Sequence, residues 1–171
     1  MKARKTGFMY RSARILGSAS ATVVVSLATS LGSVAHAEYD LKGYSPAQCR
    51  TFGPYSSSGV YYYHDRVQNT STSDYAMVIC PAIMDSESNN PYFGANIYFK
   101  KATASPAFYC YVFSVNLASS SYRWYYNADT TTVGVAGLYN SSIQSFRYGS
   151  NSVICGLPPG SELLNYYAGE S

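Results

Sequence analysis

Hydrophobic positions in this chain occur in short continuous runs or in strict alternation with polar positions, and both patterns are typical of β-strands. The clearest run covers residues 75–83, which is too short for a helix and too apolar to have one exposed face. It therefore predicts a buried central strand. Pro81 is expected to end the pairing of this strand because proline has no amide hydrogen to donate. Residues 107–116 form a second run of the same kind, and residues 95–101 alternate apolar and polar side chains.

The rest of the chain after residue 37 divides into shorter candidates separated by turn residues. Residues 38–44 are expected to form a polar lead-in, and residues 45–49 a turn or one short helical turn. Further strands are predicted at residues 60–67, 122–127, 132–138, 142–148, 151–157 and 163–168, the last of them as an edge strand. Strands of this length and spacing predict an all-β protein with a single antiparallel β-sandwich, either jelly-roll-like or immunoglobulin-like.

The first 37 residues have the pattern of a secretory signal peptide. Five basic residues precede a moderately apolar segment at 15–31, and residues 35–37 (AHA) supply a cleavage pattern of small residues. We expect cleavage before Glu38, so that residues 38–171 form one mature domain with no membrane span. The mature protein is expected to be exported, either to the periplasm or to the cell exterior.

Removing this segment reverses the sign of the net charge. The full chain carries 12 basic and 9 acidic residues, for a net charge of +3. Five of the basic residues and none of the acidic ones precede Glu38, which leaves 7 basic and 9 acidic residues and a net charge of −2. Nucleic acid is therefore not expected as a partner, because its phosphates are recognised by clustered basic residues.

The mature chain contains four cysteines, Cys49, Cys80, Cys110 and Cys155. An even count in an exported protein predicts two disulfides, and three pairings are possible. We favour Cys49 with Cys80 and Cys110 with Cys155, because each bridge would tie the edge of a half-domain to its own central strand. A zinc site would need closely spaced ligands, but successive cysteines are at least 30 residues apart. No cofactor is predicted.

The cysteines belong to a longer pattern. It runs from Cys49 through a tyrosine-rich strand to residues 67–71 (VQNTS) and 78–81 (VICP), and then to Cys110 and residues 155–160 (CGLPPG). This arrangement resembles exported bacterial four-cysteine β-sandwich proteins of no established activity. The resemblance implies an exported, disulfide-bonded β-sandwich and identifies no functional residue.

Residues suited to catalysis are sparse. His64 is the only histidine after residue 37, and no Gly-x-Ser-x-Gly turn presents a serine nucleophile. A glycosidase needs two carboxylates on opposite sides of the scissile bond, and most of the acids lie in predicted loops, where they are expected to be solvated. These acids are Asp65, Asp74, Asp85, Glu87, Asp129 and Glu162. We therefore expect no enzymatic activity.

One loop carries a weak calcium pattern. Asp85, Glu87 and Asn89 place oxygen donors on alternate residues, and oxygen is the ligand type that calcium prefers. The loop lacks the glycine and the terminal glutamate of an EF-hand. The preferred alternative is a solvated hairpin loop without a metal.

Tyrosine is the most conspicuous residue type. Of the 19 tyrosines, 18 lie after residue 37. Alternation within a strand places Tyr61 and Tyr63 on one face, and it likewise places Tyr122, Trp124 and Tyr126 on one face. Exposed flat rings can stack on sugars or on partner side chains, whereas tyrosine can also fill the layers of a small sandwich.

Three functions follow from these features, in order of preference. The first is an exported, non-catalytic module that binds a glycan or a cell-surface polymer through the exposed rings. The alternative is an envelope structural or protein-interaction protein without a small ligand. A hydrolase ranks third, because it needs an acid pair or an activated serine that the sequence does not offer.

Overall fold

The computed structural model describes residues 40–53, 59–85 and 91–171 of the chain. Over these residues it contains one short 3-10 helix, η1 (Pro46–Gln48), and eleven strands. The strands are β1 (Asp40–Tyr44), β2 (Arg50–Thr51), β3 (Val60–Tyr62), β4 (Val67–Asn69), β5 (Ala76–Ala82), β6 (Tyr92–Lys101), β7 (Phe108–Asn116), β8 (Ser121–Asp129), β9 (Gly134–Gln144), β10 (Ser150–Leu157) and β11 (Glu162–Glu170). The predicted all-β class is confirmed. No helix in these ranges is long and apolar enough to cross a membrane.

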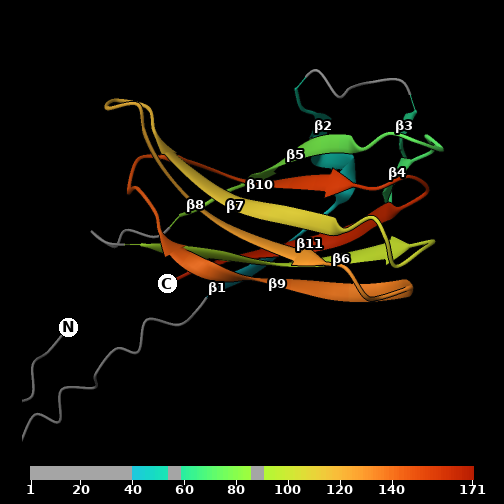
Figure 1. Cartoon of the computed structure of the whole chain (residues 1–171). Helices are drawn as coiled ribbons and strands as arrows, with labels where there is room; N and C mark the ends of the chain where they lie inside the picture. The colour runs from blue at the N-terminus through green and yellow to red at the C-terminus, as the bar shows by residue number, and fades with distance from the viewer. Residues whose placement is uncertain (1–39, 54–58, 86–90) are drawn as a thin grey trace, which may run out of the picture. The chain divides into compact units, whose positions relative to one another are not determined.

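The described strands form two antiparallel sheets that pack face to face (Figure 1). The six-stranded sheet has the order β3-β4-β11-β6-β9, with β1 also paired to β11, and the five-stranded sheet has the order β2-β5-β10-β7-β8. Without the short strands β1, β2 and β3, the two orders are β4-β11-β6-β9 and β5-β10-β7-β8, which is the order of a jelly roll. Of the two predicted architectures, the structure selects the jelly roll.

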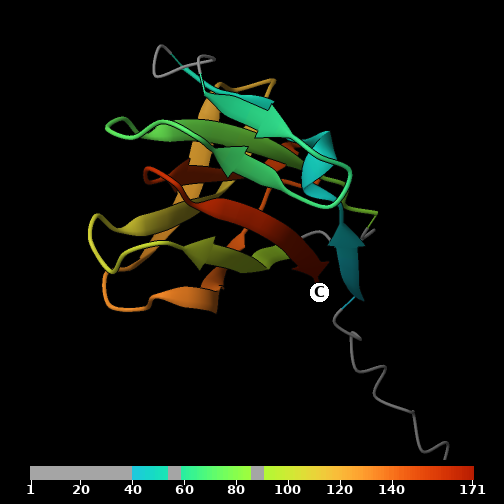
Figure 2. The same ribbon diagram turned by 90° about the vertical axis from the view of Figure 1, so that its right-hand side faces the viewer.

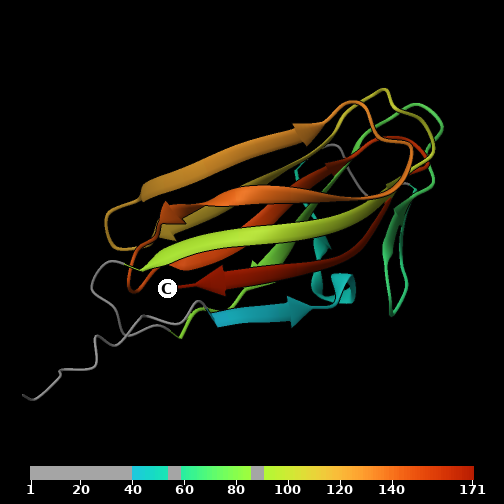
Figure 3. The ribbon, with the colours of Figure 1, turned by 90° about the horizontal axis from the view of Figure 1, so that it is seen from below.

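The prediction of residues 163–168 as an edge strand is wrong, because β11 pairs with β6 along one edge and with two strands along the other. β4 pairs with Glu162 and Leu163 at its start, whereas β1 pairs with its last five residues, from Tyr166 to Glu170. Figure 2 shows β1 beside the end of β11, and Figure 3 shows β9, β6, β11 and β1 side by side. The expected polar lead-in is therefore wrong from residue 40 onward, because the free edge of β11 pairs with the backbone of this segment.

The core lies between the sheets and is built from alternate residues of the central strands. Phe99 of β6 and Phe108 of β7 stack across it, with ring centroids 4.2 Å apart. Tyr166 of β11 is fully buried, and its hydroxyl donates a hydrogen bond of 2.6 Å to the carbonyl oxygen of Pro81 in β5. This bond joins the two sheets directly.

Both disulfides have the predicted pairing. Cys49 follows η1, precedes β2 and is bonded to Cys80 in β5, so this bridge ties an edge segment to a central strand as expected. Cys110 and Cys155 lie directly opposite each other in β7 and β10. The second bridge therefore joins two central strands, and the edge role that we expected for it is wrong.

Residues 60–67, predicted as one strand, form the hairpin of β3 and β4. The amide of Tyr63 donates to the carbonyl oxygen of Arg66 at 2.8 Å and closes a turn that contains His64 and Asp65. A continuous strand would direct one of these two polar side chains inward, whereas the turn leaves both exposed.

The predicted break between residues 132–138 and 142–148 is also wrong, since β9 is continuous from Gly134 to Gln144. Asn140 lies at the expected break. Its side chain is buried and donates a hydrogen bond of 3.1 Å to the carbonyl oxygen of Cys110. This partner allows a polar residue to remain within the strand.

Pro81 does not end β5, because it pairs in register with Ser152 of β10. On the other side of β5, β2 pairs only with Val78 and Ile79. Among the described residues, no strand therefore pairs with this side of β5 at Pro81, where a missing amide hydrogen is tolerated.

Candidate functional site

The outer face of the five-stranded sheet is aromatic and apolar. Along β7, Cys110 and Val112 point into the core, so the residues between and beyond them point outward. The outward residues include Tyr111 and Phe113, which lie opposite Tyr126 and Trp124 of β8. Alternation on two adjacent strands therefore gathers four rings on one face.

These rings border a groove with a volume of about 470 Å³. Its floor includes Met77 and Ile79 of β5 and Ile154 of β10, and Phe52, which follows β2, lies on its far side. The complete lining is Phe52, Met77, Ile79, Tyr111, Phe113, Val115, Leu117, Tyr122, Trp124, Ser150, Ser152 and Ile154. None of these side chains is acidic or basic, so the groove is uncharged.

The aromatic rings along the groove contact one another, and two of them remain exposed to solvent. Tyr111 meets Trp124 nearly edge-on at 5.9 Å and an angle of 70°. Phe113 stacks on Tyr122 at 5.8 Å and 20°. Tyr122 is nevertheless 63% exposed and Trp124 55% exposed. The wall therefore presents ring surface to solvent from a supported position.

The predicted set Tyr122, Trp124 and Tyr126 does share one exposed face. Tyr122 and Trp124 line the groove, and Tyr126 lies beside it against Tyr111, with centroids 5.0 Å apart. Sequence reasoning missed the floor residues of β5 and β10, because apolar side chains on both faces of a strand look like core from either side.

Tyr61 and Tyr63 are not part of this groove. Tyr61 lies in β3 of the six-stranded sheet, opposite Gln68, and is 57% exposed. Tyr63 lies just beyond β3, with the guanidinium of Arg66 over its ring at 4.4 Å. The structure therefore separates these two rings from the β8 set.

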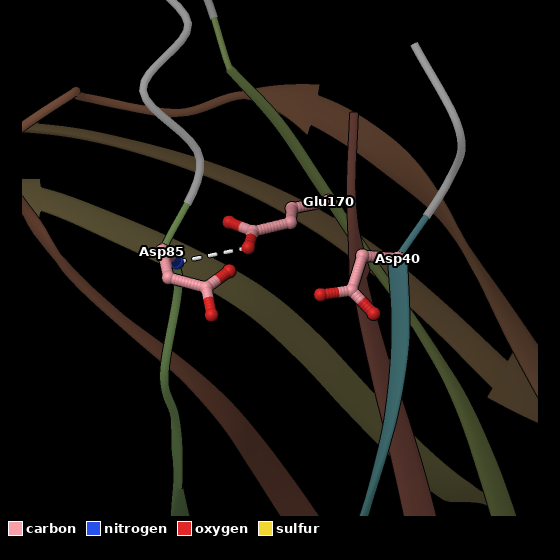
Figure 4. Close-up of side chains that lie close together, drawn as sticks. All are labelled: Asp40, Asp85 and Glu170. Carbon is pink, nitrogen blue, oxygen red and sulfur yellow. Dashed lines mark hydrogen bonds between the residues drawn. The ribbon is translucent and has the colours of Figure 1, made fainter. Parts of the chain in front are cut away.

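The calcium pattern has a different environment from the one expected. Glu87 and Asn89 lie outside the described residues, whereas Asp85 lies beside Asp40 and Glu170 (Figure 4), with carboxylate oxygens within 4.8 Å of one another. The Lys42 ammonium group already forms ion pairs with all three carboxylates, at 2.6 Å from Asp85 and 3.2 Å from each of Asp40 and Glu170. A lysine thus supplies the positive charge that a metal would supply.

This cluster shifts two pKa values. Hydrogen bonding with Glu170, and then with Lys42, lowers the pKa of Asp85. The hydrogen bond to Asp85 is the largest effect that raises the pKa of Lys42. Both shifts favour the charged forms of the two residues.

His64 lies in the turn between β3 and β4. It is exposed, and its carbonyl oxygen accepts a hydrogen bond of 2.9 Å from the Ser45 hydroxyl. The neighbouring Asp65 bonds Arg66 at 3.1 Å. The one histidine after residue 37 is thus a residue of an exposed turn.

Other acids considered for catalysis are held by basic side chains or turns. Asp129 bonds the buried Lys101 at 3.3 Å, and Glu162 bonds Lys100 at 3.4 Å. The Asp74 carboxylate accepts a hydrogen bond of 2.9 Å from the Ser73 hydroxyl. Each of these three carboxylates thus has a partner within the fold.

No protein-family model and no curated protein matches this sequence. Solved structures with a similar fold include a GH26-CBM35 β-(1,4)-mannanase of Podospora anserina, with a TM-score of 0.41 and 9% identity over 77% of this chain and 28% of that one. A variant of the family 29 module CBM29-2 complexed with mannohexaose has a TM-score of 0.35 and 11% identity over 77% of this chain and 76% of that one. The family 11 carbohydrate-binding module of a cellulosomal cellulase of Clostridium thermocellum has a TM-score of 0.34 and 8% identity, over 77% of this chain and 85% of that one. The chain thus spans less than a third of the mannanase.

Proposed function

We propose that this protein is a non-catalytic binding module that holds a glycan in the groove on the outer face of the five-stranded sheet. The observation that carries the proposal is the exposed aromatic wall of Tyr122 and Trp124 above an uncharged floor. The C–H faces of a sugar ring pack on such aromatic surface. Hydroxyl groups of Tyr111, Ser150 and Ser152 provide donors and acceptors for the sugar hydroxyls.

A binding role suits the chemistry of the groove better than a catalytic one. Acid–base hydrolysis of a glycosidic bond needs two carboxyl groups beside the bond, and the twelve lining residues include neither a carboxyl group nor a histidine. The lining is suited to hold a sugar and to exclude water from its apolar faces.

Export is part of the same proposal. Two disulfides persist in oxidising compartments, and the basic, apolar and small-residue order of the first 37 residues is that of a signal peptide. We place the mature protein in the periplasm or outside the cell, as its resemblance to exported four-cysteine bacterial proteins implies.

The test is retention of the oxidised mature domain on insoluble polysaccharides, with a glycan array to identify the sugar. Trp124→Ala is expected to weaken binding at least about tenfold, because a central aromatic side chain often dominates a binding surface. Circular dichroism checks that the variant is folded.

Tyr61→Ala is the matched control, since it removes a similarly exposed ring from the other sheet. Equal retention of wild type and Trp124→Ala, or loss of retention only in Tyr61→Ala, would overturn the assignment of the groove.

A second candidate is supported by the same lining, of which ten residues are apolar or aromatic and two are serines. An apolar segment of an envelope protein also fits such a surface. Co-purification of one partner that Trp124→Ala releases, with no glycan bound, would favour this protein-interaction role.

A further inference from the structure

The outer face of the six-stranded sheet has a hollow of its own. It lies over β6 and β9, has a volume of about 260 Å³, and is lined by Asn96, Ile97, Tyr98, Gly137, Leu138 and Tyr139. It belongs to the sheet opposite the one that carries the groove. No feature of the proposed groove involves these residues.

Strand register builds this hollow. Asn96 of β6 lies opposite Tyr139 of β9 on one side and Tyr167 of β11 on the other. Tyr98, two residues along β6, lies opposite Gly137. Because Gly137 has no side chain, the space beside the Tyr98 ring stays open.

The two tyrosines that flank the hollow are supported but exposed. The Tyr98 ring meets Tyr167 edge-on at 5.9 Å and 79°. The carbonyl oxygen of Tyr139 accepts a hydrogen bond of 2.7 Å from the side chain of Asn127. Tyr98 is 43% exposed and Tyr139 61% exposed. The contact with Tyr167 holds the Tyr98 ring in place, so this ring offers surface to a ligand without a large loss of side-chain freedom on binding. The hydrogen bond from Asn127 fixes the backbone of Tyr139 and leaves its ring exposed.

The polar chemistry of the hollow differs from that of the groove. Asn96 lies two residues from Tyr98 along β6 and opposite Tyr139 of β9, so its amide adds donors and an acceptor beside both rings. The nearest charges along β6 and β11 are Lys100 and Glu162, which neutralise each other at 3.4 Å. A neutral ligand with several hydroxyl groups fits this combination.

We propose that this hollow is a second carbohydrate site, which takes a single uncharged sugar ring. Its volume is below the roughly 300 Å³ at which pockets for drug-sized ligands begin, so it suits one ring rather than a chain. Sugar C–H groups pack on the Tyr139 and Tyr98 rings, and the Asn96 amide bonds ring hydroxyls. Such a site takes the terminal ring of a polymer chain, so a protein that binds one chain in the groove and the end of another in the hollow gains avidity on a polysaccharide surface.

The test is a titration of ¹⁵N-labelled mature protein with the methyl glycosides of glucose, mannose and galactose, followed by amide chemical shifts. We expect at least one glycoside to shift the amides of residues 96–98 and 137–139. Tyr139→Ala is expected to weaken this binding at least about fivefold, because it removes one stacking surface. Trp124→Ala is expected to leave it unchanged.

Gly137→Ala is an independent variant that adds a methyl group to the hollow beside the Tyr98 ring. A methyl group there would lie 3.6 Å from the Tyr98 ring, an ordinary contact, so the fold is expected to be retained. The proposal is overturned if none of the glycosides shifts these amides, or if Tyr139→Ala and Gly137→Ala both bind like wild type. These readouts do not depend on the groove, so either site can fail while the other stands.

Discussion

At the scale of single residues, Lys42 connects three carboxylates from different segments. Its ammonium group forms ion pairs with Asp40 in β1, Asp85 after β5 and Glu170 in β11. Glu170 is almost completely buried, and a buried carboxylate needs a charged partner or hydrogen-bond donors. Lys42 thus links β1 to the end of β11 through its ion pair with Glu170.

Lys42→Met is expected to lower the free energy of unfolding by about 1–2 kcal/mol at neutral pH, because buried Glu170 loses a charged hydrogen-bond partner. The pKa of Asp85 is lowered from 3.8 on folding. Its contribution to the free energy of unfolding is therefore present above pH 3.8 and is lost as the pH falls further. The pKa of Lys42 is raised from 10.5 on folding. Its contribution to the free energy of unfolding is therefore present below pH 10.5 and is lost as the pH rises further.

The measurement is urea unfolding of wild type and Lys42→Met across this pH range. Lys100→Met, which removes an exposed partner of Glu162, is the control and should cost less than about 0.5 kcal/mol. Equal losses for the two variants would contradict the role of Lys42.

At the scale of elements, the two disulfides have different tasks. Cys110 and Cys155 join strands that are already paired along their length. The bridge from Cys49 to Cys80 instead holds β2, which pairs with β5 through only two residues. Phe52, whose amide donates to the Met77 carbonyl oxygen at 2.8 Å, follows β2 and lines the groove. The first bridge therefore supports the groove as well as the fold.

Replacing either cysteine pair with alanine is expected to cost about 3.5–4 kcal/mol by loop-entropy arithmetic. Only Cys49→Ala with Cys80→Ala is expected to speed hydrogen exchange locally at β2 and Phe52 and to weaken groove binding. Thermal unfolding and amide exchange by mass spectrometry measure the two effects. Identical exchange changes in both double variants would contradict the special role of the first bridge.

At the scale of the whole molecule, charge and binding surface are separated. The residues after position 37 carry a net charge of −2, whereas the twelve residues that line the groove are uncharged. If the groove binds a glycan as proposed, long-range electrostatics are therefore expected to contribute little to its affinity, and ring stacking most of it.

Binding in the groove is accordingly expected to change less than about twofold between about 50 mM and about 500 mM salt. Retention on a neutral and on an acidic polysaccharide, measured across this range, checks the expectation. A steep fall in affinity with salt would show that charged residues outside the groove carry the binding.

Several local features of this protein follow from the sequence alone. Period-two alternation puts Tyr122 and Trp124 on one exposed face, because successive side chains of a strand point to opposite sides. Four cysteines after a signal-like segment predict two disulfides, and the preferred pairing is confirmed. The break at Asn140 was wrong because its buried hydrogen-bond partner, the Cys110 carbonyl oxygen, lies on a strand 30 residues away in the sequence.

The all-β class, the aromatic face of β8 and a set of cysteines suited to two bridges are thus predictable from the amino-acid sequence, because they depend on residue type and local spacing. The jelly-roll order, the pairing of β5 at Pro81 and the separation of Tyr61 from Trp124 depend on how distant segments pack. The same packing forms the groove from Phe52 and strands β5, β7, β8 and β10, and the hollow from β6 and β9. Alternation specifies the face on which a side chain lies, but the neighbouring strand is chosen by packing of the whole chain.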